Sequence, residues 1–312
     1  MRNNQIKYVV LSNPIQKVLK FTIYSRKLKT LIFIAFLFPL IDALPSWAQG
    51  TVTLQLRWAE TGHLAGFFIA LKKGFYAEEG LDVRLKEANA HTNVVDEVVS
   101  GRAQYGIGTS GIIIDRQQGK PIVVLAVINQ RSSNMLVTAY SSPIQSIDEI
   151  RGKDVMIAPY TEDILAYLKL HGLEAQYNRL NHSMDLQDLI KGKVYAMTIS
   201  CPQPLEELEQ MGFRYHVYNP RTDGIDFYGD NLFTSETEIN NNPHRVSAFI
   251  KATLLGWQFV ADSPKEAAEI IAKAYPEKGG ADQILRQINA ILPYIKSDIV
   301  PIGFMHEGRW RY

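Results

Sequence analysis

Hydrophobic and polar residues alternate with a period of two along residues 51–58, which predicts a strand with one buried face. Between residues 63 and 76 the apolar positions change to helical spacing. After Gly80 a second strand is expected to begin at residue 81. This strand–helix–strand order is typical of a βαβ unit in an α/β protein. Because ligands of open α/β sheets bind beyond the carboxyl ends of strands, the loop over residues 58–63 is a candidate binding loop.

The same two periods recur along the rest of the chain, so further strands and helices are expected to alternate. Thr92 and Thr161 are expected to cap helices, and the apolar run at 121–129 to form a fully buried strand. Trp257 lies at a core position of a long helix. Further strands are predicted at 104–108, 135–140, 154–158, 194–199 and 213–218, and helices at 91–99, 146–150, 164–171, 184–191 and 282–292, with two more from about 242 and from 263.

The first 48 residues differ from the remainder in charge and in hydrophobicity. Seven basic residues and one acid surround an apolar run at 31–41, and Ser46-Trp47-Ala48 offers a small-x-small cleavage sequence. The run is short and contains Pro39, so a signal peptide cleaved near Ala48 is favoured over a membrane anchor, with an uncleaved anchor as the alternative. The mature protein is therefore expected to be periplasmic or secreted.

Charge and cysteine content narrow the classes of partner. Because residues 1–48 contribute +6 to a whole-chain charge of +1, the remainder carries about −5, which argues against a nucleic-acid partner. Cys201 is the single cysteine, so no intramolecular disulfide and no cysteine zinc cluster can form. No histidine pair has metal-ligand spacing, and no catalytic signature is present. We therefore expect no metal site and no catalytic residue.

Several phrases after residue 50 resemble one family of proteins: RWAETGHLAGFFIALKKGFYAEEGLDVRL, SGRAQYGIGTSGIII, SIDEIRGKDVMIAP and IGFMHEGRW. They are similar to the thiamine-pyrimidine-synthase-like branch of the periplasmic solute-binding proteins, which is related to the nitrate-, sulfonate- and taurine-binding components of ABC transporters. The resemblance implies an α/β, two-lobed, type II periplasmic-binding-protein-like fold, with two central mixed sheets flanked by helices and two hinge strands. It divides the chain into lobe 1 at 49–139 plus 234–312 and lobe 2 at 140–233.

Candidate ligand contacts follow from strand ends and from the resemblance. The aromatic rings of Trp58 and Tyr228 suit stacking, and the turn at Ser110 places a hydroxyl at a helix start. For Ser110 and Thr161 a plain helix cap is the alternative. The candidates for ligand binding are Trp58, Glu60, His63, Ser110, Thr161, Gln203, Asp226, Tyr228 and Asp230.

One position departs from the family pattern. Relatives usually place an Asn-Glu-Pro triplet at the turn where this chain has Pro202-Gln203-Pro204. Gln203 keeps hydrogen-bonding capacity without charge, so a cationic or aminopyrimidine group held there would lose its ionic partner.

Binding is the leading functional hypothesis. The protein is expected to carry a thiamine-pyrimidine-precursor-like solute in an interlobe cleft, without a cofactor, and to deliver it to an ABC permease or a membrane signalling partner. The resemblance leaves two alternatives. One is a thiamine pyrimidine synthase-like enzyme that uses pyridoxal phosphate and iron, for which Cys201 cannot replace the family's cysteine cluster. The other is the extracytoplasmic sensor domain of a truncated signalling protein.

Overall fold

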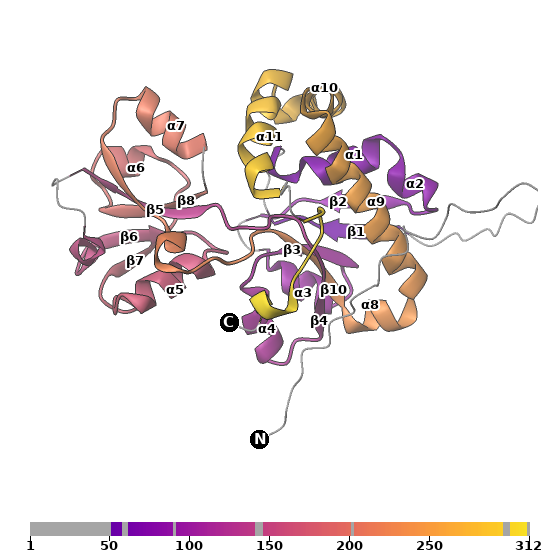
Figure 1. Cartoon of the computed structure of the whole chain (residues 1–312), viewed down its shortest axis with the longest axis horizontal. Coiled ribbons are helices and arrows are strands. Elements are labelled where there is room, and N and C mark those ends of the chain that lie inside the picture. Colours follow the sequence, from indigo (N-terminus) through magenta and orange to yellow (C-terminus); the bar gives the residue numbers. More distant parts are fainter. Residues whose placement is uncertain are drawn as a thin grey trace, which may run out of the picture. The chain divides into compact units, whose positions relative to one another are not determined.

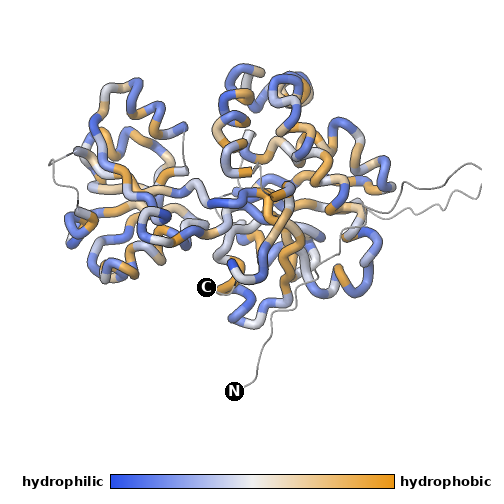
Figure 2. The backbone as a smooth tube through the Cα atoms, viewed as in Figure 1, coloured by the Kyte–Doolittle hydropathy of each residue, from blue (hydrophilic) through white to orange (hydrophobic). Residues whose placement is uncertain are grey.

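The computed structural model describes residues 51–57, 62–89, 92–140, 146–200, 203–295 and 300–310. The expected signal peptide therefore lies outside the described residues. Residues 49–312 form one compact unit that contains two five-stranded sheets (Figure 1). Hydrophilic residues concentrate at the turns between elements, and hydrophobic residues follow the strands (Figure 2).

The first sheet has the strand order β2-β1-β3-β10-β4. β1 pairs in parallel with β2 and β3, whereas β10 runs antiparallel between β3 and β4. Its strands are β1 (Val52–Gln55), β2 (Val83–Lys86), β3 (Tyr105–Gly108), β4 (Ile122–Val127) and β10 (Asn231–Ser235).

The second sheet has the order β7-β6-β8-β5-β9. β6 is parallel to β7 and β8, and β5 is antiparallel to β8 and β9. Its strands are β5 (Asn134–Ala139), β6 (Asp154–Ile157), β7 (Asn178–Asn181), β8 (Ala196–Ser200) and β9 (Tyr215–Tyr218). Both sheets are mixed and flanked by helices, as the predicted fold class requires.

The strands that belong to each sheet differ from the predicted division of the chain at both lobe boundaries, 139/140 and 233/234. β5 belongs to the second sheet because it pairs with β8 and β9, although the prediction assigned residues up to 139 to lobe 1. All of β10 belongs to the first sheet, so the return to that sheet precedes the expected boundary at 233/234. Each sheet packs against its own buried hydrophobic residues, and we call the first sheet with its helices the first lobe and the second sheet with its helices the second lobe.

Helices cover both sheets, and two expected caps differ from those observed. Asn93, not Thr92, caps α3 by accepting a hydrogen bond from the Asp96 backbone N–H. Thr161 precedes α5 but makes no capping hydrogen bond. The α-helices are α1 (Ala65–Lys72), α2 (Phe75–Glu78), α3 (Val94–Val99), α4 (Ile112–Gln117), α5 (Glu162–Leu170), α6 (Gln187–Ile190), α7 (Gln203–Gln210), α8 (Glu236–Asn241), α9 (Pro243–Asp262), α10 (Pro264–Ala274) and α11 (Ala281–Ile295). Short 3-10 helices include η2 (Gly62–Leu64) and η3 (Ile147–Ile150).

The first lobe is built on a close contact between α1 and α9. Trp257 is 1% exposed, which confirms its core position. A Cβ atom on Gly256 would lie 2.2 Å from the carbonyl oxygen of Gly66, and one on Gly66 would lie 2.1 Å from the Trp257 ring. Both glycines are therefore needed for the two helix backbones to approach this closely. None of the helices in the described part of the chain is both long and apolar enough to cross a membrane.

The C-terminal segment, residues 300–310, contacts both of the connections that run between the sheets. Gly303 bridges to Val127 at the end of β4. The Arg309 guanidinium donates to the carbonyl oxygens of Gln130 at 2.9 Å and of Asp226 at 2.8 Å. Because Gln130 precedes β5 and Asp226 precedes β10, this segment ties the two connections together.

Candidate ligand-binding site

A cavity of about 250 Å³ lies between the two lobes and draws its walls from both. The first lobe contributes Arg57, beyond the end of β1, and His63 in η2. The second lobe contributes the carboxyl end of β8, the start of α7, and loop residues near β6 and β7. The position agrees with the general rule for α/β sheets, since β1 and β8 both end at the cavity. Its apolar lining includes Met184, Leu186, Met197 and Ile199.

Arg57 enters the cavity wall as half of a buried ion pair. Its guanidinium donates to the carboxylate of Asp230, and the two side chains are 13% and 6% exposed. The guanidinium carbon also lies 5.6 Å from the centre of the Tyr160 ring. Asp230 offsets the charge of Arg57 at this wall. The sequence predicted Asp230 as a ligand contact, and the structure gives it this cation as a partner.

His182 lines another side of the cavity, and both of its ring nitrogens form hydrogen bonds with the backbone. Nδ1 accepts a hydrogen bond from the Met184 N–H at 2.9 Å, and Nε2 donates to the Thr198 carbonyl at 2.7 Å. This pattern requires the neutral ring with its proton on Nε2. Burial lowers the pKa of His182, in agreement with a neutral ring, although the bond to Thr198 acts in the opposite direction. Met184 has a positive φ of 61°, so the turn that follows the histidine is tight.

Hydroxyl groups line the floor of the cavity near Ala158. The Thr198 hydroxyl accepts from the Ala158 N–H at 2.8 Å, and the Thr161 hydroxyl donates to the Ala158 carbonyl at 2.7 Å. Ser200 is bonded to Ser133, with 2.7 Å between the two Oγ atoms. These bonds orient the hydroxyls before any solute arrives, which reduces the ordering cost of binding.

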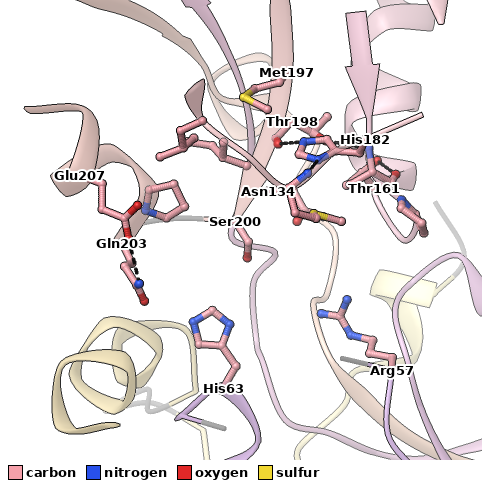
Figure 3. A pocket seen from close by; sticks show the side chains of 16 residues that line it. Arg57, His63, Asn134, Thr161, His182, Met197, Thr198, Ser200, Gln203 and Glu207 are labelled. Atoms are coloured by element: carbon pink, nitrogen blue, oxygen red, sulfur yellow. Dashed lines mark hydrogen bonds between the residues drawn. The ribbon is translucent and has the colours of Figure 1, made fainter. Parts of the chain in front are cut away.

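Gln203 and Glu207 form a polar pair one turn apart at the start of α7. Nε2 of Gln203 donates to Oε1 of Glu207 at 3.1 Å, and both side chains line the cavity. Figure 3 shows the pair on the opposite side of the view from Arg57, with His63 below them. The cavity therefore has a carboxylate–carboxamide pair on one side and an offset cation on the other.

The predicted site residues divide into three groups. His63, Thr161 and Gln203 line the cavity. Trp58 and Glu60 lie outside the described residues. The remaining candidates, which do not line the cavity, are Ser110, Asp226, Tyr228 and Asp230. Ligand contact by any of the candidates stays a prediction.

The candidates away from the cavity make contacts within the protein. The Ser110 hydroxyl donates to the carbonyl of Tyr228 at 2.8 Å. The Tyr228 hydroxyl accepts from the His306 N–H at 2.9 Å, and the Arg309 guanidinium carbon lies 3.9 Å from the centre of the Tyr228 ring. The carboxylate of Asp226 lies 3.2 Å from Arg309. These residues hold the C-terminal segment against the interlobe connections.

A direct contact between the lobes lies beside these residues. Thr109, after β3, donates its hydroxyl proton to Glu162 in α5 at 3.0 Å. A Cβ atom on Gly111 would lie 2.3 Å from the Glu162 carboxyl carbon, so only glycine fits there without a shift. Burial raises the pKa of Glu162. Glu162, in the first turn of α5, thus helps to join the lobes.

Two mixed sheets with a cavity between them define the fold of the periplasmic solute-binding proteins. Solved structures share this fold. The aliphatic sulphonate-binding protein SsuA from Escherichia coli matches with a TM-score of 0.60 and 15% identity over 77% of this chain and 82% of that one. The nitrate-binding protein NrtA from Synechocystis matches with a TM-score of 0.54 and 16% identity over 71% of this chain and 65% of that one. The predicted fold class is confirmed.

The chain belongs to the family described as NMT1/THI5 like, which matches residues 61–267, about two thirds of its length. The family assignment from the sequence is thus confirmed. The riboflavin-binding protein RibY of Chloroflexus aurantiacus is 23% identical over 87% of this chain and 81% of its own length. A formylaminopyrimidine-binding protein of Halalkalibacterium halodurans is 23% identical over 72% and 70%. A 4-amino-5-hydroxymethyl-2-methylpyrimidine phosphate synthase of Legionella pneumophila is 25% identical over 73% and 75%. Binding proteins and synthases both occur among the relatives.

Proposed function

We propose that this protein is an exported solute-binding component of an ABC-type importer, and that it binds a small planar heteroaromatic solute related to the thiamine pyrimidine. The cavity between the lobes carries this proposal. It combines apolar side chains of methionine, leucine and isoleucine with polar side chains that internal hydrogen bonds hold in place, and such polar groups can fix the orientation of a small solute. Its position at the carboxyl ends of β1 and β8 is the expected one for a ligand.

The size of the cavity favours a one-ring solute. Its volume of about 250 Å³ is below the range of roughly 300–1,000 Å³ that is usual for pockets holding drug-sized ligands. A substituted pyrimidine is therefore a better match than a tricyclic ring system. Among the relatives, the formylaminopyrimidine-binding protein is named for a solute of the favoured size.

The enzyme alternative rests on a specific observation, because His63 lines the cavity and some relatives are named as synthases. Pyridoxal phosphate would require a lysine for its Schiff base. The described residues of the cavity wall include no lysine. The described wall therefore does not fit this cofactor.

A ligand screen tests the proposal. The full chain is expressed with export, and the purified product is heated with 4-amino-5-hydroxymethyl-2-methylpyrimidine, riboflavin, taurine, nitrate or pyridoxal phosphate. We expect the pyrimidine to raise the melting temperature, because a ligand that binds only the folded state stabilises it by mass action. A shift with pyridoxal phosphate alone would favour the synthase. Export also predicts a mature N terminus at Gln49, which N-terminal sequencing checks.

A further inference from the structure

Beyond a general solute-binding role, we propose that Glu207 selects the ligand of this cavity. The site takes a neutral or cationic solute that presents N–H donors, and it disfavours anions. This inference rests on the proposed function and deepens it. Sequence reasoning did not single out Glu207, and its place in the wall follows from the structure.

The geometry of α7 pairs two acceptors. Gln203 and Glu207 are four residues apart on one helix, so their side chains share a face. Nε2 of Gln203 donates to Oε1 of Glu207 at 3.1 Å. A carboxylate is an acceptor only, and the amide oxygen of a glutamine is also an acceptor. The pair therefore offers the solute its second carboxylate oxygen and the Gln203 carbonyl oxygen.

The charges in the wall point to the same class of ligand. Arg57 is offset by Asp230 in a buried pair. His182 is neutral, since its Nδ1 accepts a backbone hydrogen bond. Glu207 has no ion-pair partner among the residues that the structure describes. Glu207 is thus an acidic group of the described wall that takes part in no described ion pair, and an anionic solute bound beside its carboxylate would meet repulsion.

Two neighbouring acceptors complement two neighbouring N–H donors. An exocyclic amino group beside a ring nitrogen that carries a proton has this pattern, and a protonated amidine edge adds a charge-assisted bond to the carboxylate. Taurine and phosphate esters would bring a negatively charged group to the same acceptors. An amino-substituted heterocycle is therefore the ligand class that matches the pair.

Glu207 also bears on the replacement of an acid by Gln203 in the sequence Pro202-Gln203-Pro204. The resemblance to the family implies an acid at the position of Gln203, so the glutamine suggested that the site had lost its ionic partner. The helix restores an acidic group one turn later, in contact with that glutamine. A negative charge is therefore present in the cavity wall, on Glu207 and not at position 203.

The test compares Glu207→Gln with Glu206→Gln by isothermal titration calorimetry. Glu206 is exposed on the same helix, and its variant has the same change in net charge. The probes are 4-amino-5-hydroxymethyl-2-methylpyrimidine, its phosphate ester and taurine, and circular dichroism verifies that each variant is folded. Removing a charged hydrogen-bond acceptor should weaken binding of the unphosphorylated pyrimidine by about 10- to 100-fold in Glu207→Gln. Glu206→Gln should bind like the wild type, and the gap between pyrimidine and phosphate ester should narrow only in Glu207→Gln.

Three results would overturn the inference. If the pyrimidine binds the wild type and Glu207→Gln equally, Glu207 does not select the ligand, although the binding function stands. If the wild type binds the phosphate ester or taurine as tightly as the pyrimidine, the wall does not disfavour anions. A folded wild type that binds none of the probes would contradict the proposed ligand class itself, and the inference with it.

Discussion

Asp230→Asn removes the negative charge from the buried pair that joins the end of β1 to the start of β10. The two side chains are 13% and 6% exposed, so water screens the pair poorly. The variant leaves the Arg57 cation in the same buried position with a neutral side chain opposite it. Breaking a buried ion pair by removing one partner costs about 3–5 kcal/mol. Because asparagine still offers a carbonyl oxygen to the guanidinium, we expect a loss near the lower end, about 3 kcal/mol.

Urea unfolding at pH 7 measures this loss, with Glu266→Gln as the control. Glu266 lies 3.7 Å from Lys73 in a pair whose side chains are 34% and 56% exposed, so its loss should cost less than about 1 kcal/mol. Replacing both members of the buried pair, in Arg57→Met with Asp230→Leu, should recover most of the stability, because apolar side chains leave no buried charge. If Asp230→Asn costs no more than the control, the pair behaves like a surface ion pair and the reasoning about its burial is refuted.

Two further predictions concern the second lobe and the helix contact of the first. Burial lowers the pKa of His182 below its usual 6.5 in the folded protein, so the unfolded chain binds more protons in acid. The neutral ring therefore contributes fully to the free energy of unfolding above pH 6.5. That contribution is lost as the pH falls through the pKa of the folded state. The difference in unfolding free energy between the wild type and His182→Asn should therefore shrink between pH 7.5 and pH 5, by at most about 1.4 kcal/mol per pH unit, and urea titrations that show a constant difference would contradict this. Gly256→Ala should destabilise the protein by about 1–3 kcal/mol, because the added methyl group would lie 2.2 Å from the Gly66 carbonyl oxygen. Leu255→Ala, at a 42% exposed position of the same helix, is the control, and equal melting temperatures for the two variants would exclude the clash.

Much of the fold could be predicted from hydrophobic spacing, because most strands and helices carry a regular apolar face. β7 is the informative exception. All of its residues are exposed, so no apolar alternation marks Asn178–Asn181 as a strand. Without that strand, His182 could not be recognised as a residue at a strand's carboxyl end. The predicted first strand also extended to residue 58, whereas β1 ends at Gln55, which places Arg57 beyond the strand and in the cavity wall.

Residues of the candidate site could be predicted only where a local sequence pattern marks them. Gln203 was found because a short family motif marks its turn, and it lines the cavity. Glu207 carried a signal in its four-residue spacing from Gln203, but nothing in the sequence shows that this helix face meets the cavity. Asp230 and Tyr228 have side chains that could bind a ligand. In the structure Asp230 instead contacts Arg57, and Tyr228 contacts the C-terminal segment, both far away in the sequence. Such partners depend on the packing of the lobes and leave no local pattern.

Binding of the solute in the interlobe cavity is tested most directly by titrating the wild type and Ser200→Trp with 4-amino-5-hydroxymethyl-2-methylpyrimidine. Ser200 lines the cavity, so an indole ring there should occupy the space of a one-ring solute. Leu170→Trp, at a 61% exposed position of α5, serves as the matched control. We expect one binding site per chain in the wild type and in Leu170→Trp, and no measurable heat of binding in folded Ser200→Trp. Equal binding by all three proteins would show that the solute binds elsewhere and would contradict the assignment of this cavity.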